Sequence, residues 1–265
     1  MLIQRFWAAL SILSLLPAPR LSDEAYRDSG ALLSFAPLVG AVISLLCTLS
    51  ALSLYALAKN PSPWLAAAVF VIAEAFLTRG FHLDGLADTF DGFGGGWNKE
   101  RILEIMRDHA IGSFGALALI SALLLKTVCL ASVWQNQSLP AAILFSLLVP
   151  VFSRTVMVYQ AAFNVYARDS QSLAGNVVNG TQQKHFLYAA GLALFIAAAA
   201  LAALGLKFPV SAALEPIFAA VLSGFAAAAL LGLISRRKIG GVTGDVLGAS
   251  VELSEAVMLT VLALF

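Results

Sequence analysis

The sequence predicts an all-α protein, a polytopic integral membrane bundle of about seven transmembrane helices with a short N-terminal interfacial or re-entrant helix. Of its 265 residues, 60% are hydrophobic and only 12% are charged, whereas a soluble domain is about 45–50% apolar. The apolar residues also gather in segments suited to the roughly 30 Å hydrocarbon layer of a bilayer. Because no internal repeat or linker interrupts them, residues 1–265 are expected to form a single domain.

Each expected element corresponds to one stretch of the chain. Residues 4–16 are apolar but short, and the Pro17-Ala18-Pro19 break favours an interfacial or re-entrant helix over a cleaved signal peptide. The expected transmembrane segments are 34–58, 63–79, 112–134, 141–160, 185–205, 211–234 and 246–265. The second of these segments is short and contains Glu74. In the loop that follows it, Asn98 fits the N-cap of a short amphipathic helix.

The basic residues predict the orientation of the chain. The loops 17–33, 80–111, 161–184 and 235–245, with Arg79 at the edge of the second, contain Arg20, Arg27, Arg79, Lys99, Arg101, Arg107, Arg168, Lys184, Arg236, Arg237 and Lys238. The opposite loops contain only Lys59 and Lys207. Because cytoplasmic loops are enriched in Lys and Arg, the first set is expected to be cytoplasmic and the C-terminus to lie outside. A net charge of +1 implies no basic surface for nucleic acid.

The strongest chemical signal is the acidic stretch RGFHLDGLADTFDGFGGG at residues 79–96. Asp84, Asp88 and Asp91 stand at i, i+4 and i+7, so on a helix they fall within about 60° of one another. Favourable placement near a helix N-terminus explains one or two carboxylates, but not three on one stripe. Like charges repel unless a cation lies between them, and Mg²⁺ prefers oxygen ligands. This stripe therefore predicts metal or phosphate chemistry.

The same stretch contains other candidate groups. The backbone N–H groups of Gly94 and Gly95, with Gly96, could bind phosphate, although a flexible loop explains the glycines equally well. His82 lies on the far side of the helix from the acidic stripe. We therefore expect His82 to be a structural or substrate-contacting group and not a ligand of the same metal.

The segment GGVTGDVLGAS at residues 240–250 is a second polar constellation. Asp245 opens the last expected helix, with Thr243 as a cap, and Glu252 and Glu255 follow on nearly the same face. Ionisable groups in a membrane usually face the bundle interior or a watery cavity. The alternative is a packing face on which the two glutamates are protonated or paired.

Several other charged residues have two interpretations each. Arg154 could bind phosphate, or it could pair with Glu252 or Glu255. Arg168 could hold an anionic substrate, although topology alone accounts for half of the basic set. Asp108 could be a further metal ligand or a helix cap. Lys126 could extend toward the interface or pair with Glu74, and Cys47 and Cys129 are expected to be buried, inert thiols.

Three blocks resemble the cobalamin synthase family, also called adenosylcobinamide-GDP ribazoletransferases. They are GFHLDGLADTFDGFGGG (80–96), EIMRDHAIGSFGALAL (104–119) and GGVTGDVLGA (240–249), and the resemblance extends over essentially the whole chain. The sequence departs from the family pattern at His109 and Val242, and VYAR (165–168) is a partial match. The resemblance implies a multi-pass enzyme of the bacterial inner membrane, surrounded by membrane lipid, with its active site on the cytoplasmic side.

The resemblance also implies the reaction. The enzyme would join adenosylcobinamide-GDP to α-ribazole or its 5′-phosphate in late vitamin B12 biosynthesis, release GMP and use Mg²⁺. For this chemistry we expect Asp84 and Asp88 to be metal ligands and Asp91 to be a ligand or the general base. We expect Asp245 to be a further ligand or the base and Asp108 a supporting ligand, and the choice of base among Asp88, Asp91 and Asp245 stays open. His82, Gly94, Gly95, Arg154 and Arg168 are the expected substrate-binding residues.

Two other function classes remain as alternatives. CDP-alcohol phosphotransferases also space aspartates around an Asp-Gly pair, but here Ala87-Asp88 stands where that family has Ala-Arg. An ion-coupled transporter would explain Glu74, Glu252 and Glu255, yet transporters usually show repeats and midplane sites. A homo-oligomer or an assembly with other enzymes of the pathway is compatible with either enzyme.

Overall fold

The computed structural model describes residues 2–22, 26, 28–59, 62–168, 172–204 and 210–265, and Arg27 and Lys207 of the orientation argument lie outside them. All named elements of this part of the chain are helices. In order they are α1 Leu2–Leu13, α3 Ser29–Leu33, α4 Ala36–Leu57, α5 Pro63–Leu77, α6 Phe81–Gly95, α7 Lys99–Ile105, α8 Ser113–Asn136, α9 Leu139–Phe163, α10 Leu173–Gly180, α11 Gln183–Leu204, α12 Val210–Ile239 and α13 Gly244–Leu262.

The polytopic helical bundle is confirmed, but the expected number of seven spans needs correction. Five helical stretches of the described chain are long and apolar enough to cross a bilayer, namely residues 29–57, 113–136, 139–163, 183–204 and 213–239. The segment expected at 63–79 is a 15-residue helix, and α5 and α6 bend by 87° at their junction, so together they count as at most one broken span. The last expected segment, α13, contains three carboxylates in 19 residues. It is therefore too acidic to be counted among the candidate membrane spans.

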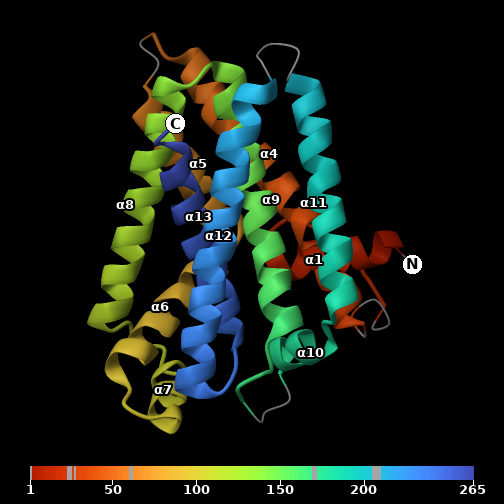
Figure 1. The fold of residues 1–265 in the computed structure, drawn as a ribbon, viewed down its shortest axis with the longest axis vertical. Helices are drawn as coiled ribbons and strands as arrows, with labels where there is room; N and C mark the ends of the chain where they lie inside the picture. The colour runs from red at the N-terminus through yellow and green to blue at the C-terminus, as the bar shows by residue number, and fades with distance from the viewer. Residues whose placement is uncertain (1, 23–25, 27, 60–61, 169–171, 205–209) are drawn as a thin grey trace.

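The long helices pack around α9 and α13, as Figure 1 shows. Of the most apolar 18-residue stretch of α9, 89% is buried, against 17% for α11, which presents most of its surface outward. Small residues allow the helix backbones to approach closely, as is usual in membrane bundles. A Cβ on Gly40 of α4 would lie 2.4 Å from the carbonyl oxygen of Pro150 on α9.

The short helices gather toward one end of the bundle. α7 and α10 lie at the end where α9 and α12 finish, and α1 runs across the long helices (Figure 1). The helix expected within residues 4–16 is thus confirmed as α1. The backbone N–H of Leu15 donates to the carbonyl oxygen of Leu77, and the Arg79 guanidinium donates to that of Ser14. These bonds attach the end of α1 to the junction of α5 and α6.

Five buried charged side chains connect α5, α8, α9 and α13. The Lys126 ammonium lies 3.0 Å from carboxylate oxygens of Glu74 and Glu252 and also pairs with Glu255. Arg154 pairs with Glu255 and lies 2.9 Å from Glu74. The sequence left open whether these residues act in a site or form ion pairs with one another. In the structure they form ion pairs. The carboxylates that suggested a transporter therefore have basic partners within the bundle.

Candidate active site

The acidic helix α6 begins at a sharp backbone turn. Arg79 and Gly80 both have positive φ, at 58° and 66°, which ends α5 and redirects the chain so that Asp84 falls in the first turn of α6. Glycine then permits close contact with α13, because a Cβ on Gly85 would lie 2.7 Å from the carbonyl oxygen of Asp245. Residues 160 positions apart are thereby brought together at one site.

The loop before α13 positions Asp245 and Arg168. Backbone hydrogen bonds of 2.9 Å join Ala167 and Val165 to Val242, and the Thr243 hydroxyl caps α13 by accepting from the Val246 N–H. Arg168 then reaches Asp245, with 2.9 Å between the guanidinium and the carboxylate. The arrangement places an anion-binding group directly beside a carboxylate.

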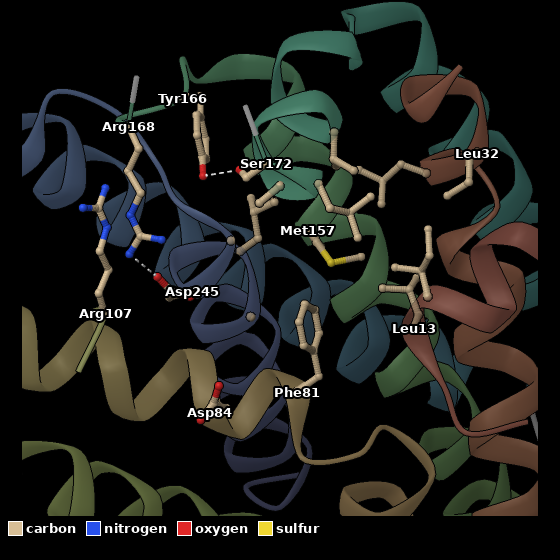
Figure 2. Close-up of a pocket in the computed structure, with 18 residues that line it drawn as sticks. Leu13, Leu32, Phe81, Asp84, Arg107, Met157, Tyr166, Arg168, Ser172 and Asp245 are labelled. Carbon is tan, nitrogen blue, oxygen red and sulfur yellow. Dashed lines mark hydrogen bonds and ion pairs between the residues drawn. The ribbon is translucent and has the colours of Figure 1, made fainter. Parts of the chain in front are cut away.

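These residues line a cavity of about 590 Å³ with two distinct ends. Figure 2 shows Arg107, Arg168, Asp245 and Tyr166 toward one end, with Asp84 below them on α6. Leu13 and Leu32 lie at the other end, and Met157 lies between the two. The Tyr166 and Ser172 hydroxyls are 2.8 Å apart on the cavity wall.

A second cavity of about 650 Å³ adjoins the first. Both cavities are lined by Ile12, Phe81, Asp84 and Leu173. The second also has Arg79 and Ile111 in its wall. Asp84 is therefore accessible from two spaces.

Negative charge accumulates around Asp88, which is half-buried in the middle of α6. Burial raises the pKa of Asp88 to about 7, and the carboxylates of Asp245 and Asp84 act in the same direction. Such mutual repulsion is what a bound cation would relieve. The hydrogen-bonding oxygens and charge of this group suit Mg²⁺.

The carboxylates do not form a closed metal cage. Among the described residues, no group of three His, Cys, Asp or Glu side chains is placed to hold an ion. Mg²⁺ is usually bound through one or two carboxylates together with substrate phosphate oxygens. Asp84 and Asp245, which both line the first cavity, fit that pattern of binding.

Two further aspartates have other contacts. Both carboxylate oxygens of Asp91 accept backbone N–H bonds of 2.8 Å, from Gly112 and Gly115 at the start of α8. Asp108 is exposed, accepts the N–H of Ala110 at 3.0 Å and lines neither of these cavities. The structure thus brings together Asp84, Asp88 and Asp245, while Asp91 caps a helix and Asp108 closes a turn.

The remaining predicted substrate-binding residues, except Arg168, lie away from the two cavities. Gly94 and Gly95 belong to the last turn of α6, where Cβ atoms would meet Phe114 and Ile105, rather than to an open phosphate loop. His82 is 1% exposed, and neither ring nitrogen has a hydrogen-bond partner. Arg154 is held in the buried ion-pair group described above.

Several residues that line the first cavity were not predicted from the sequence. Arg107 was counted only as a topological marker, although it stands in the 104–119 block next to Asp108. Tyr166 belongs to the partial VYAR match and could have been found there. Phe81 and the apolar side chains of α1 and α3 carried no signal, because they resemble ordinary membrane residues.

Comparisons with known proteins show the family of this chain. A family profile described as cobalamin-5-phosphate synthase matches residues 5–263. A protein of Chlorobium phaeobacteroides named adenosylcobinamide-GDP ribazoletransferase is 38% identical over 250 residues, covering 94% of this chain and 93% of its own length. Proteins of the same name from Syntrophobacter fumaroxidans and Acetivibrio thermocellus are 38% and 34% identical, and each alignment covers at least 97% of both chains.

No solved structure shows a significant match. The chain belongs to the cobalamin-5-phosphate synthase family, because the profile spans almost all of it. The matches give no support to the CDP-alcohol phosphotransferase and transporter alternatives.

Proposed function

We propose that this member of the cobalamin-5-phosphate synthase family is an adenosylcobinamide-GDP ribazoletransferase of the inner membrane. It transfers the cobinamide phosphate group to a ribose hydroxyl of α-ribazole or its 5′-phosphate. A new O–P bond forms, the bond to the bridging diphosphate oxygen breaks, and GMP leaves with the electron pair of that bond. The products are adenosylcobalamin or its 5′-phosphate and GMP.

One observation carries this proposal. Carboxylates of Asp84 and Asp245 line a single cavity together with Arg107 and Arg168, and these residues come from four separate segments. Phosphoryl transfer depends mainly on positioning and on neutralising charge, so a site that combines potential metal ligands with guanidinium groups suits it.

We assign the carboxylates and arginines as follows. Asp84 and Asp245 would hold Mg²⁺ together with diphosphate oxygens of the donor, with the carboxylate of Asp88 as the neighbouring negative charge. When bound, Mg²⁺ would neutralise charge on the diphosphate and on the departing GMP. The Arg168 guanidinium exchanges Asp245 for a phosphate oxygen, and Arg107 binds a second one. The hydroxyl proton of the acceptor passes to a carboxylate of this group.

The orientation of the chain supports access to nucleotides. Basic residues belong to α7, to the first turn of α11 and to the last turn of α12. These parts lie at the end of the bundle that also has α10 (Figure 1). By the enrichment of cytoplasmic loops in basic residues, this end faces the cytoplasm, where nucleotide substrates and Mg²⁺ are available.

Asp91 stays outside the proposed ligand set because both of its oxygens accept hydrogen bonds from backbone N–H groups of α8.

GMP release tests the proposed function directly. Purified protein in detergent is mixed with adenosylcobinamide-GDP, α-ribazole 5′-phosphate and Mg²⁺, and GMP is quantified by chromatography. We expect release that requires both Mg²⁺ and the acceptor. Asp88→Asn should lower the rate at least about a hundredfold, whereas the matched control Asp108→Asn should stay near the wild-type rate.

Absence of GMP release from folded wild-type protein would refute the proposed transfer. Equal loss in Asp88→Asn and Asp108→Asn would keep the transfer but contradict the assigned metal site.

A further inference from the structure

The first cavity has an apolar end whose occupant the proposed function does not specify. Its walls include Leu13 at the end of α1, Leu32 on α3 and Met157 on α9, which are at most 3% exposed. In Figure 2 these labelled side chains lie away from Arg107 and Asp245. Every charged side chain that lines the cavity belongs to the opposite end or to α6.

The proposed reaction offers four large groups for this space, and their chemistry separates them. The adenine of the donor's adenosyl group has, like guanine, donors and acceptors along its edge that would be left without partners here. The corrin is a macrocycle with many amide side chains, too large and too polar for one end of a 590 Å³ cavity. Guanine has several donors and acceptors along its edge, and burying them beside leucine and methionine would leave them without partners, at a substantial cost. The dimethylbenzimidazole of α-ribazole is a flat bicycle with two methyl groups and one free ring nitrogen.

We propose that the apolar end binds the benzimidazole base of the acceptor, with Leu32 limiting the size of the base. This inference rests on the proposed function. The ribose of the bound acceptor then extends toward Asp84 and Asp245, where the diphosphate of the donor is held. The adjoining second cavity, which also reaches Asp84, is open to part of the donor.

The position of Phe81 supports this assignment. Its ring is 47% exposed although it lies in the first turn of the acidic helix, and it lines the cavity close to the labelled apolar side chains (Figure 2). Bases stack favourably on exposed aromatic side chains. The α1 helix gains a function in this arrangement, because Ile12 and Leu13 at its end form part of the wall around the base.

Base selectivity of the acceptor tests the inference. GMP release is measured with saturating donor and two acceptors, α-ribazole 5′-phosphate and the 5′-phosphate of the unsubstituted benzimidazole riboside. Leu32→Phe narrows the apolar end and should therefore disfavour the larger, dimethylated base. The kcat/KM for α-ribazole 5′-phosphate, divided by the kcat/KM for the unsubstituted acceptor, should fall at least about tenfold. The KM for the donor should stay within about twofold of wild type.

The matched control is Leu45→Phe, the same substitution at an exposed leucine of α4 that lines neither cavity. It should leave the ratio unchanged. If Leu32→Phe does not fold, Leu32→Ala tests the opposite direction. The larger space in Leu32→Ala should admit a bulkier base. The kcat/KM for a naphthimidazole riboside phosphate, relative to that for α-ribazole 5′-phosphate, should rise about tenfold.

A ratio that is the same in Leu32→Phe, Leu32→Ala and wild type overturns the inference, as does an effect confined to the KM of the donor. Both outcomes leave the transferase activity intact. A wild-type protein that releases no GMP would instead refute the proposed function and this inference with it.

Discussion

At the scale of single residues, the aspartates of one polar constellation have different surroundings. Asp84 is exposed to the cavity, and Asp245 is paired with Arg168 at 2.9 Å. Asp88 is half-buried between carboxylates, whereas Asp91 is fully engaged by backbone N–H groups. A cation on Asp91 would leave two backbone N–H groups unpaired, whereas a cation on Asp245 displaces a guanidinium that a phosphate oxygen of the substrate can take over.

The raised pKa of Asp88 predicts a pH-dependent requirement for Mg²⁺. Without the cation its pKa is about 7, so below pH 7 the carboxyl is mostly protonated and Mg²⁺ must displace a proton. The Mg²⁺ concentration for half-maximal GMP release should therefore rise about tenfold per pH unit below 7 and level off above it. Titrations between pH 6 and pH 8 check this.

Asp108→Asn is the matched control for that titration and should reproduce the wild-type curve. A half-maximal Mg²⁺ concentration that is constant from pH 6 to pH 8 would contradict the assignment of Asp88 to the cation.

The sequence predicted the acidic stripe because helical periodicity places i, i+4 and i+7 on one face. It could not predict which carboxylates remain available. The Asp91 carboxylate accepts hydrogen bonds from backbone N–H groups at the start of α8, more than 20 residues further along the chain. That contact depends on how α6 and α8 pack, which periodicity does not encode.

At the scale of elements, the start of α8 depends on a side chain from α6. Gly112 and Gly115 leave room for the Asp91 carboxylate, since a Cβ at either position would lie within 2.4 Å of its oxygens. The first N–H groups of a helix lack partners within it, and a carboxylate there also favours the helix dipole. Asp91 therefore connects the site helix to a membrane span.

Asp91→Ala should destabilise the protein by about 2 kcal/mol, because two N–H donors lose their acceptor. The measurement is the free energy of unfolding in mixed micelles, with Asp108→Ala as an exposed control that should change it by less than about 0.5 kcal/mol. Equal stability of Asp91→Ala and wild type would show that the cap contributes nothing.

The membrane elements illustrate what apolar length can and cannot predict. All seven expected segments contain helices, because long apolar runs have few other stable structures in a bilayer. The 87° bend between α5 and α6 was not expected, since it depends on the positive φ of Arg79 and Gly80. An arginine in that conformation has no clear signature in a single sequence.

At the scale of the whole molecule, the buried ion pairs fix four helices relative to one another. Lys126 of α8 contacts Glu74 of α5 and Glu252 and Glu255 of α13. Because Asp245 lies in the first turn of α13 and α5 leads into α6, this group also determines how the two halves of the active site meet. Its members were recognised in the sequence, but their pairing required the fold.

Lys126→Met should lower the free energy of unfolding by about 3–5 kcal/mol, because it leaves buried carboxylates without their cation. The double substitution Lys126→Met with Glu252→Gln should recover part of that loss, since it removes one unpaired charge. Unfolding in mixed micelles measures both, and Lys59→Met on an exposed loop is the control. A single variant as stable as wild type would show that the group does not hold the helices together.

In the proposed site, Asp84 and Asp245 from distant parts of the chain hold one divalent cation on the donor diphosphate. The most direct measurement is electron paramagnetic resonance of Mn²⁺, a substitute for Mg²⁺, bound to purified protein with adenosylcobinamide-GDP present and the acceptor omitted. We predict that Asp84→Asn and Asp245→Asn each weaken Mn²⁺ binding at least about tenfold, while Asp108→Asn binds like wild type. Wild-type Mn²⁺ affinity in both Asp84→Asn and Asp245→Asn would contradict the account.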